Sequence, residues 1–292
     1  MKCAHLAKPD CGGVAKAGLA PHHPLPEEIQ AMSAAAFPEI REAEAPPDIA
    51  AIYAALNEGI GIGQVNLIWR HAAALPGVLD WLWAQAAPAL ASGVAAAARD
   101  RITAAITLPA PPKAPSAVPA GIRALIEVYH RGNATNLGLL TAMLLRQQGM
   151  APGAPMLPAP RGPMLPAPPA LPRLAILPAA LQVQIRTLTA AHGLSDGAVV
   201  PSLYVHLALW PDFLAGLPDM LAPLRAHAGL THWRDAAVEA ARDTAPGLIA
   251  ALGPAPAAPA ALPEFLARLE VFVREVIPGM VPVGIFLRRV LT

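Results

Sequence analysis

The chain has 292 residues, of which 55% are apolar and 14% are charged, and its 21 basic and 20 acidic side chains leave a formal net charge of +1. A chain this apolar can bury a large core, which excludes global disorder. The balanced charge lacks the basic surface that nucleic acid or an anionic membrane attracts, so we expect neither partner. Only 4% of residues are aromatic, among many Ala, Leu and Val, which predicts an all-α fold of closely packed helices.

Residues 1–36 mix Cys, His, Gly and Pro and are predicted to be a disordered leader. They contain no apolar stretch like that of a secretory signal, so we expect a cytoplasmic protein in a reducing setting. The two cysteines, Cys3 and Cys11, show no C-x-x-C spacing and have no H-E-x-x-H motif beside them. We therefore expect no metal site here.

The first predicted helix lies within residues 38–56, where early glutamates precede apolar residues at helical spacing. A glycine-rich run at 59–63 ends it, and its spacing differs from the phosphate-binding G-x-G-x-x-G pattern. A second helix is predicted at 65–75. Pro76 and Pro88 are each expected to open a further helix.

Residues 81–98 carry no charge, yet they are mostly Ala and include Gln85, Pro88 and Ser92. The stretch falls short of the roughly 20 strongly apolar residues that a membrane-spanning helix needs. It is therefore predicted to be buried helix and not a membrane span.

Proline clusters divide the remainder of the chain, which has 35 prolines in all. They lie at 108–119, 151–172 and 253–263. The middle cluster contains PMLPAP twice and predicts an extended, semi-rigid linker of the polyproline II type. Long apolar helices are predicted at 122–148 and 265–291.

The two halves of the chain repeat each other. Four residues of the first half recur 135 positions later: His71, Pro76, Leu79 and Pro88 align with His206, Pro211, Leu214 and Pro223. Further on, IEVYHR at 126–131 aligns with LEVFVR at 269–274, an offset of 143. The sequence therefore predicts two pseudo-symmetric helical repeats, 37–150 and 174–292, joined by a Pro-rich linker at 151–173.

Two familiar catalytic motifs are missing: the chain has no G-K-[ST] and no H-E-x-x-H. We expect neither a metal nor a cofactor. Polar residues inside apolar helices are then the best clue, because burying them costs free energy unless they are hydrogen-bonded or functional.

Asn133 and Asn136 lie in the middle of a predicted long helix, although asparagine is a poor helix former. Their repeat counterparts are Val276 and Gly279, and this asymmetry favours a functional role. The alternative is a satisfied core amide or a local bend beside Gly132. His71 and His206 recur symmetrically, which favours a shared hydrogen bond between helices.

Three segments resemble the group I 2-haloacid dehalogenases, the D,L-2-haloacid halidohydrolases, over about residues 37–291. They are FPEIREAEAPPDIAAIYAALNEGIGIGQVNLIWRHAAALPGVLDWLWAQAAPAL, IEVYHRGNATNLGLLTAML and VPSLYVHLALWPDFLAGLPDMLAPL. The resemblance implies two all-α pseudo-repeats with the active site between them, commonly in a homodimer. It also implies that an aspartate of the second repeat activates water, which displaces halide directly from the α-carbon of a small 2-halocarboxylic acid. An asparagine of the first repeat then holds the water or the substrate.

Carried over by position, the family's asparagine falls on Asn133 and its aspartate falls on Leu203, which cannot act as a base. The neighbouring serine is kept, and positions that are aromatic in the family are not aromatic here. The substrate-binding positions implied in this way are Gln64, Leu67, Asn136, Ser202 and Leu203.

Two nearby residues could replace the missing base. His206 follows Leu203 by one helical turn, and a neutral imidazole accepts a proton near pH 7. Asp196 lies in a Gly-flanked turn, where capping explains it better. Asn133 and His206 are therefore the predicted catalytic residues.

Two hypotheses follow for function. The first is a dehalogenase-like hydrolase acting on a small-molecule carboxylate. The alternative is a non-catalytic or differently catalytic paralogue that binds a small apolar ligand in the cleft between the repeats. A purely structural helical dimer would have no polar cleft at all.

Overall fold

The computed structural model describes residues 38–292 except 116, 195–198 and 227–228. The predicted leader at 1–36 and Asp196 lie outside the described residues. Within the described ranges every regular element is helical, which confirms the all-α prediction. None of the described helices has the length and apolarity needed to cross a membrane.

The first half of the chain begins with a short 3-10 turn and continues with α-helices, the last of which is the longest. They are η1 (Glu42–Glu44), α2 (Pro47–Ile60), α3 (Leu67–Ala73), α4 (Val78–Ala91), α5 (Val94–Ala105) and α6 (Ala120–Gln147). Gly61 ends α2 with a φ of 80°, a left-handed conformation that glycine adopts without strain. The glycine-rich stop and the long helix at 122–148 are thus both confirmed.

The second half contains a similar succession of shorter and longer helices. They are η2 (Leu174–Ile176), α7 (Ala179–Ala190), α8 (Ser202–Leu207), α9 (Pro211–Met220), α10 (Ala222–Ala226), α11 (Gly229–Ile249), α12 (Leu262–Val271), η3 (Phe272–Val276) and α13 (Ile277–Leu291). The π-helical turn η3 joins α12 and α13 into one run, which is the long helix predicted at 265–291. Such π turns occur frequently at functional sites.

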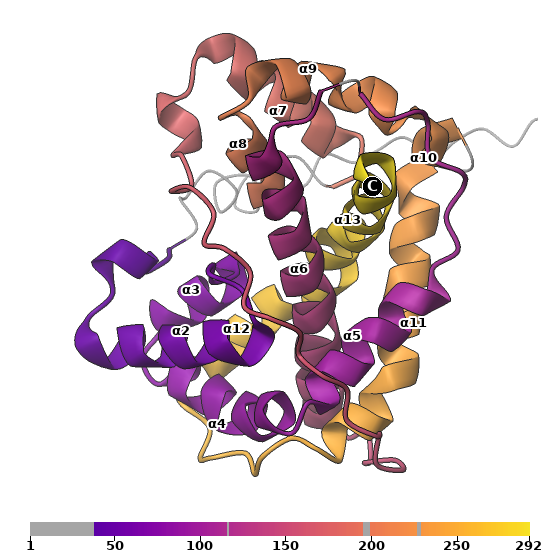
Figure 1. Cartoon of the computed structure of the whole chain (residues 1–292). Helices are drawn as coiled ribbons and strands as arrows, with labels where there is room; N and C mark the ends of the chain where they lie inside the picture. The colour runs from indigo at the N-terminus through magenta and orange to yellow at the C-terminus, as the bar shows by residue number, and fades with distance from the viewer. Residues whose placement is uncertain (1–37, 116, 195–198, 227–228) are drawn as a thin grey trace, which may run out of the picture. The chain divides into compact units, whose positions relative to one another are not determined.

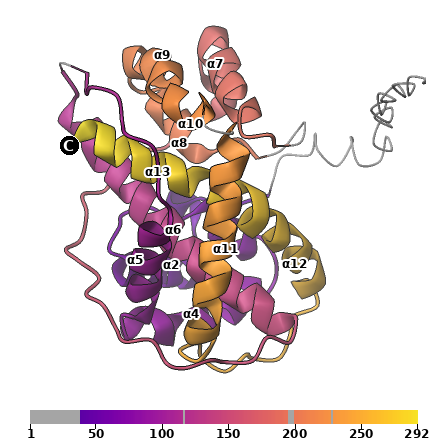
Figure 2. The same ribbon diagram turned by 90° about the vertical axis from the view of Figure 1, so that its right-hand side faces the viewer.

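Helix α6 lies at the centre of the core, with α13 and α11 packed along it and α5 beside them (Figure 1, Figure 2). Gly284 of α13 permits this approach, since a Cβ there would lie 3.3 Å from the Cα of His130. Buried apolar side chains from both halves, including Leu140 and Phe286, belong to one continuous core. The halves therefore form a single unit, Ala36–Thr292.

Pro88 does not open a helix, contrary to the prediction, because it lies inside α4. Proline cannot donate a hydrogen bond to the carbonyl of Ala84, four residues earlier. Gly253 packs against that carbonyl, and its N–H donates to the carbonyl of Gln85 at 2.9 Å. Gly253 thus lies beside the carbonyl that proline leaves without its helical donor, and the actual break falls at Gly93.

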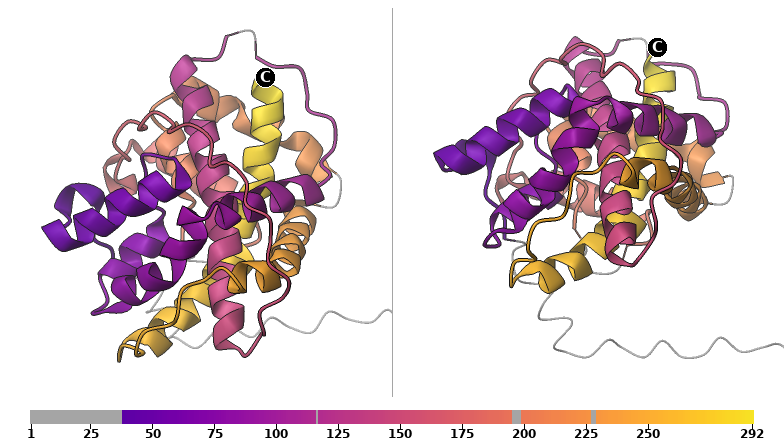
Figure 3. Two further views of the ribbon diagram at one scale, coloured as in Figure 1. Left: turned by 60° about the horizontal axis from the view of Figure 1, so that its bottom comes forward. Right: turned by 90° about the horizontal axis from the view of Figure 1, so that it is seen from below.

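The Pro-rich segment at 151–173 contains no helix and crosses the helices of both halves (Figure 3). Its backbone N–H groups donate to carbonyls of Pro246, Gly93 and Gly61, at 2.9, 3.1 and 3.0 Å. Arg131 fixes two parts of this irregular backbone from the long helix α6. Its buried guanidinium donates to the carbonyls of Gly61 (3.0 Å) and Pro163 (2.6 Å), because its several N–H groups can satisfy two irregular backbone segments at once.

Candidate functional site

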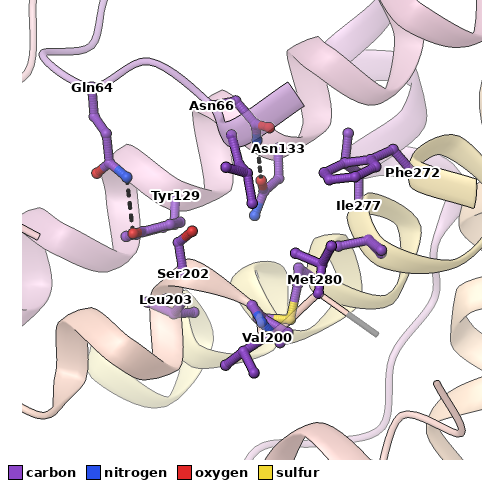
Figure 4. A pocket seen from close by; sticks show the side chains of 14 residues that line it. Gln64, Asn66, Tyr129, Asn133, Val200, Ser202, Leu203, Phe272, Ile277 and Met280 are labelled. Atoms are coloured by element: carbon purple, nitrogen blue, oxygen red, sulfur yellow. Dashed lines mark hydrogen bonds between the residues drawn. The ribbon is translucent and has the colours of Figure 1, made fainter. Parts of the chain in front are cut away.

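A pocket of about 40 Å³ lies where the α2–α3 turn, α6, the start of α8 and the η3–α13 run meet (Figure 4). A single water molecule needs roughly 10–15 Å³ of such space. The pocket therefore has room for about three waters, or for a ligand with a few non-hydrogen atoms.

The pocket has a polar side and a larger apolar side. The polar residues are Gln64, Asn66, Tyr129, Asn133 and Ser202. The apolar residues are Leu67, Val199, Val200, Pro201, Leu203, Phe272, Val276, Ile277 and Met280. No side chain in this lining, as described, carries a formal charge.

Five of the seven site residues expected from the sequence lie together around this pocket: Gln64, Leu67, Asn133, Ser202 and Leu203. Leu203, at the position implied for the base, is 1% exposed. Asn136 and His206 do not line the pocket.

Asn133 is held by a residue that the sequence analysis did not single out. Asn66 caps the N-terminus of α3, where its Oδ1 accepts from the N–H of Ile68 at 3.2 Å. The Nδ2 of Asn66 donates to the Oδ1 of Asn133, also at 3.2 Å. The position of Asn66, directly before an apolar helix, is the sequence signal for the cap.

His206 does not line the pocket but contacts Tyr129, which does. Its Nε2 donates to the carbonyl of Pro169 at 2.7 Å, so its Nδ1 is the acceptor and lies 3.2 Å from the hydroxyl of Tyr129. The hydroxyl of Tyr129 also accepts from the Nε2 of Gln64 at 2.9 Å. Burial lowers the pKa of His206 and raises that of Tyr129 above its usual range, so both groups are neutral at pH 7.

Asn136 makes two hydrogen bonds within the core. Its Oδ1 accepts from the indole N–H of Trp69 at 2.7 Å, and its Nδ2 donates to the carbonyl of Gly132 at 2.8 Å. Its side chain is 1% exposed and borders only a shallow hollow next to the pocket. This is the arrangement expected of a satisfied core amide.

Tyr129 was also missed, because a tyrosine in an apolar helix has the pattern of a core residue. The sequence signal available for Tyr129 was its alignment with Phe272 at the offset of 143. Both residues line the pocket. Across the described residues, no group of three or more His, Cys, Asp or Glu side chains is placed to hold a metal ion.

The helix order and the small pocket against α6 define an all-α protein with a pocket beside its central helix. Solved structures with this fold include a D-2-haloacid dehalogenase mutant, with a TM-score of 0.73, 16% identity, and coverage of 87% of this chain and 95% of that one. A mutant complex with D-2-CPA (TM-score 0.70, 16% identity, 87% and 95% covered) and a complex of a D-2-haloacid dehalogenase with L-LA (0.71, 16%, 87% and 96%) are also similar. The chain thus has the fold of the D-2-haloacid dehalogenases. No protein-family model and no curated protein matches it.

Proposed function

We propose that the pocket binds a small uncharged molecule with one polar end and a short apolar body, and that it does not carry out carboxylate-assisted dehalogenation. The observation that carries this proposal is the uncharged lining, in which buried Leu203 occupies the position implied for the base. A positioned base typically contributes 10²–10⁴-fold to such a reaction, and leucine contributes nothing.

The chemistry of the lining also disfavours a carboxylate ligand. Moving an ion out of water costs several kcal/mol unless an opposite charge or several hydrogen bonds replace its hydration. The two buried arginines described do not line the pocket: Arg70 is paired with Glu39 at 3.0 Å, and Arg131 donates to backbone carbonyls. An uncharged polar group needs only the side-chain amides and hydroxyls that are present.

We further infer that the chain is a tandem duplication and that the pocket lies on its pseudo-symmetry axis. Pocket residues pair at the two offsets seen in the sequence, 135 and 143. The pairs are Gln64 with Val199, Asn66 with Pro201, Leu67 with Ser202, Tyr129 with Phe272, and Asn133 with Val276. In four of these five pairs the polar member belongs to the first repeat, which supports divergence of one copy toward ligand binding.

Propanamide and propanoate test the proposal, because they have the same size and shape and differ in charge. We expect propanamide to raise the Tm of the wild-type protein, since only ligands of the folded state stabilise it. Propanoate at the same concentration and ionic strength should have no effect. Equal or greater stabilisation by propanoate would contradict the proposal, and Asn133→Ala, which removes a lining amide, is the control for binding at this pocket.

Halide release from both enantiomers of 2-chloropropionate tests the activity directly. We expect none from the wild-type protein and none from Leu203→Asp. Release by Leu203→Asp alone would show a pocket that accepts the anion and lacks only the base, which contradicts the preference for uncharged ligands. Release by the wild-type protein would favour the second candidate.

The second candidate is a dehalogenase-like hydrolase in which His206 acts as the base through Tyr129. The hydrogen bond between the Tyr129 hydroxyl and the Nδ1 of His206 favours it. A proton from a pocket water would pass to the oxygen of Tyr129 as the hydroxyl proton moves to His206. Tyr129→Phe and His206→Gln would then each abolish halide release, whereas a contaminating activity would survive both substitutions.

A further inference from the structure

The amide of Asn133 has a defined orientation that can be traced to a backbone group. The N–H of Ile68 can only donate, so the atom of Asn66 that faces it must be the oxygen. The opposite end of the Asn66 amide is therefore its NH₂ group, which must face the oxygen of Asn133. Because the oxygen of Asn133 is occupied in this way, the group of Asn133 left for other partners is its Nδ2.

The Nδ2 of Asn133 points into the pocket, on the side facing Ser202 and Met280 (Figure 4). It makes no hydrogen bond within the described part of the chain, whereas the Oδ1 of the same amide is occupied. An N–H group lining a small, largely apolar pocket is left without a partner unless a ligand or water accepts from it.

We propose that Asn66 is a positioning residue that sets the polarity of the pocket: it holds Asn133 as a hydrogen-bond donor, so that the site selects ligands presenting an acceptor such as a carbonyl oxygen. This inference rests on the proposed function, because it names the class of polar group that the same pocket receives. The Asn66 side chain has no need to touch the ligand, since it acts through the amide of Asn133.

The substitution Asn66→Asp separates helix capping from this polarity. Aspartate caps a helix as well as asparagine does, so the bond from Ile68 and the stability of α3 are kept. The second carboxylate oxygen can only accept, however, which requires Asn133 to turn its Nδ2 toward the carboxylate and its Oδ1 into the pocket. Asn133→Ala, alone and combined with Asn66→Asp, is the matched control, because it removes the amide that turns.

Two probes of similar size report the polarity of the pocket. Acetone can only accept a hydrogen bond, whereas 2-propanol can also donate one. We expect the ratio of acetone to 2-propanol affinity, from titrations of methyl-labelled protein, to fall about three- to ten-fold in Asn66→Asp. In the Asn133→Ala background no amide can turn, so a fall of the ratio there measures direct contact of the carboxylate with 2-propanol and is subtracted from the effect of the single variant. An unchanged ratio in the single variant, with both probes binding, overturns the inference and leaves the proposed function standing.

A second measurement does not depend on any ligand. In the wild-type protein, the side-chain amide protons of Asn133 should show NOEs to the methyl groups of Met280 and Ile277. Asn66→Asp should abolish these NOEs while the circular-dichroism spectrum and Tm stay near those of the wild type. Retained NOEs would overturn the inference. If neither probe binds the wild-type protein, the proposed function fails and the NOEs alone decide the orientation of Asn133.

Discussion

Lowering the pH from 7 to 5 should reduce the free energy of unfolding by about 4 kcal/mol, with two buried histidines as the cause. His130 is 5% exposed and His192 is 2% exposed. Burial, followed by the charges of Arg288, Arg99 and Arg131, lowers the pKa of His130 to about 3. Burial, followed by the charge of Arg234, lowers the pKa of His192 to about 4.

The sign of the effect follows from which state takes up protons. In the unfolded chain a histidine titrates near pH 6.5, so between pH 6.5 and the folded-state values only the unfolded state gains the proton. The stability is complete above pH 6.5 and falls as the pH falls toward 4. At pH 5, about 1.5 pH units below the unfolded value, each histidine costs about 2 kcal/mol.

Urea unfolding at pH 7 and pH 5 measures this difference. The variants His130→Gln and His192→Gln should each reduce the pH dependence by about 2 kcal/mol, whatever their stability at pH 7. A wild-type protein with the same urea midpoint at both pH values would contradict the prediction. So would a pH dependence that both substitutions leave intact.

Alanine substitutions at Asn133 and Asn136 should differ in their effects on stability and on ligand binding, although both residues lie in the buried part of α6. Asn136→Ala should lower the free energy of unfolding by about 3 kcal/mol. It leaves the buried indole N–H of Trp69 without its acceptor and opens a small cavity. Asn133→Ala should cost only about 1 kcal/mol, because its lost bond to Asn66 lies beside the pocket, where water can replace it.

Ligand binding should show the reverse order. Asn133→Ala should weaken propanamide binding, whereas Asn136→Ala should retain it under conditions in which the variant is folded. Urea unfolding and propanamide titration of the two variants, measured in parallel, provide each with a control in the same helix. A destabilised Asn133→Ala that binds normally, or a stable Asn136→Ala that does not bind, would reverse the assignment.

The local features of the fold were predictable because their signals lie within a few residues. The apolar run that predicted a helix at 122–148 corresponds to α6, and the glycine-rich run ends α2 as expected. Pro88 shows the limit of such rules, since it lies inside α4, where Gly253, far along the chain, packs beside it.

The helical class, the long helices and the candidate positions Leu203 and Asn133 could be predicted from the sequence. What each polar group faces depends on how the helices pack. Asn66 and Asn133 are 67 positions apart, and Tyr129 and His206 are 77 apart. Hydrogen bonds over such separations depend on how whole helices pack, and neither propensity nor periodicity encodes that packing locally. For the same reason the sequence did not show that His206 lies behind Tyr129 or that Asn136 accepts from Trp69. Both residues were predicted to belong to the site together with Asn133.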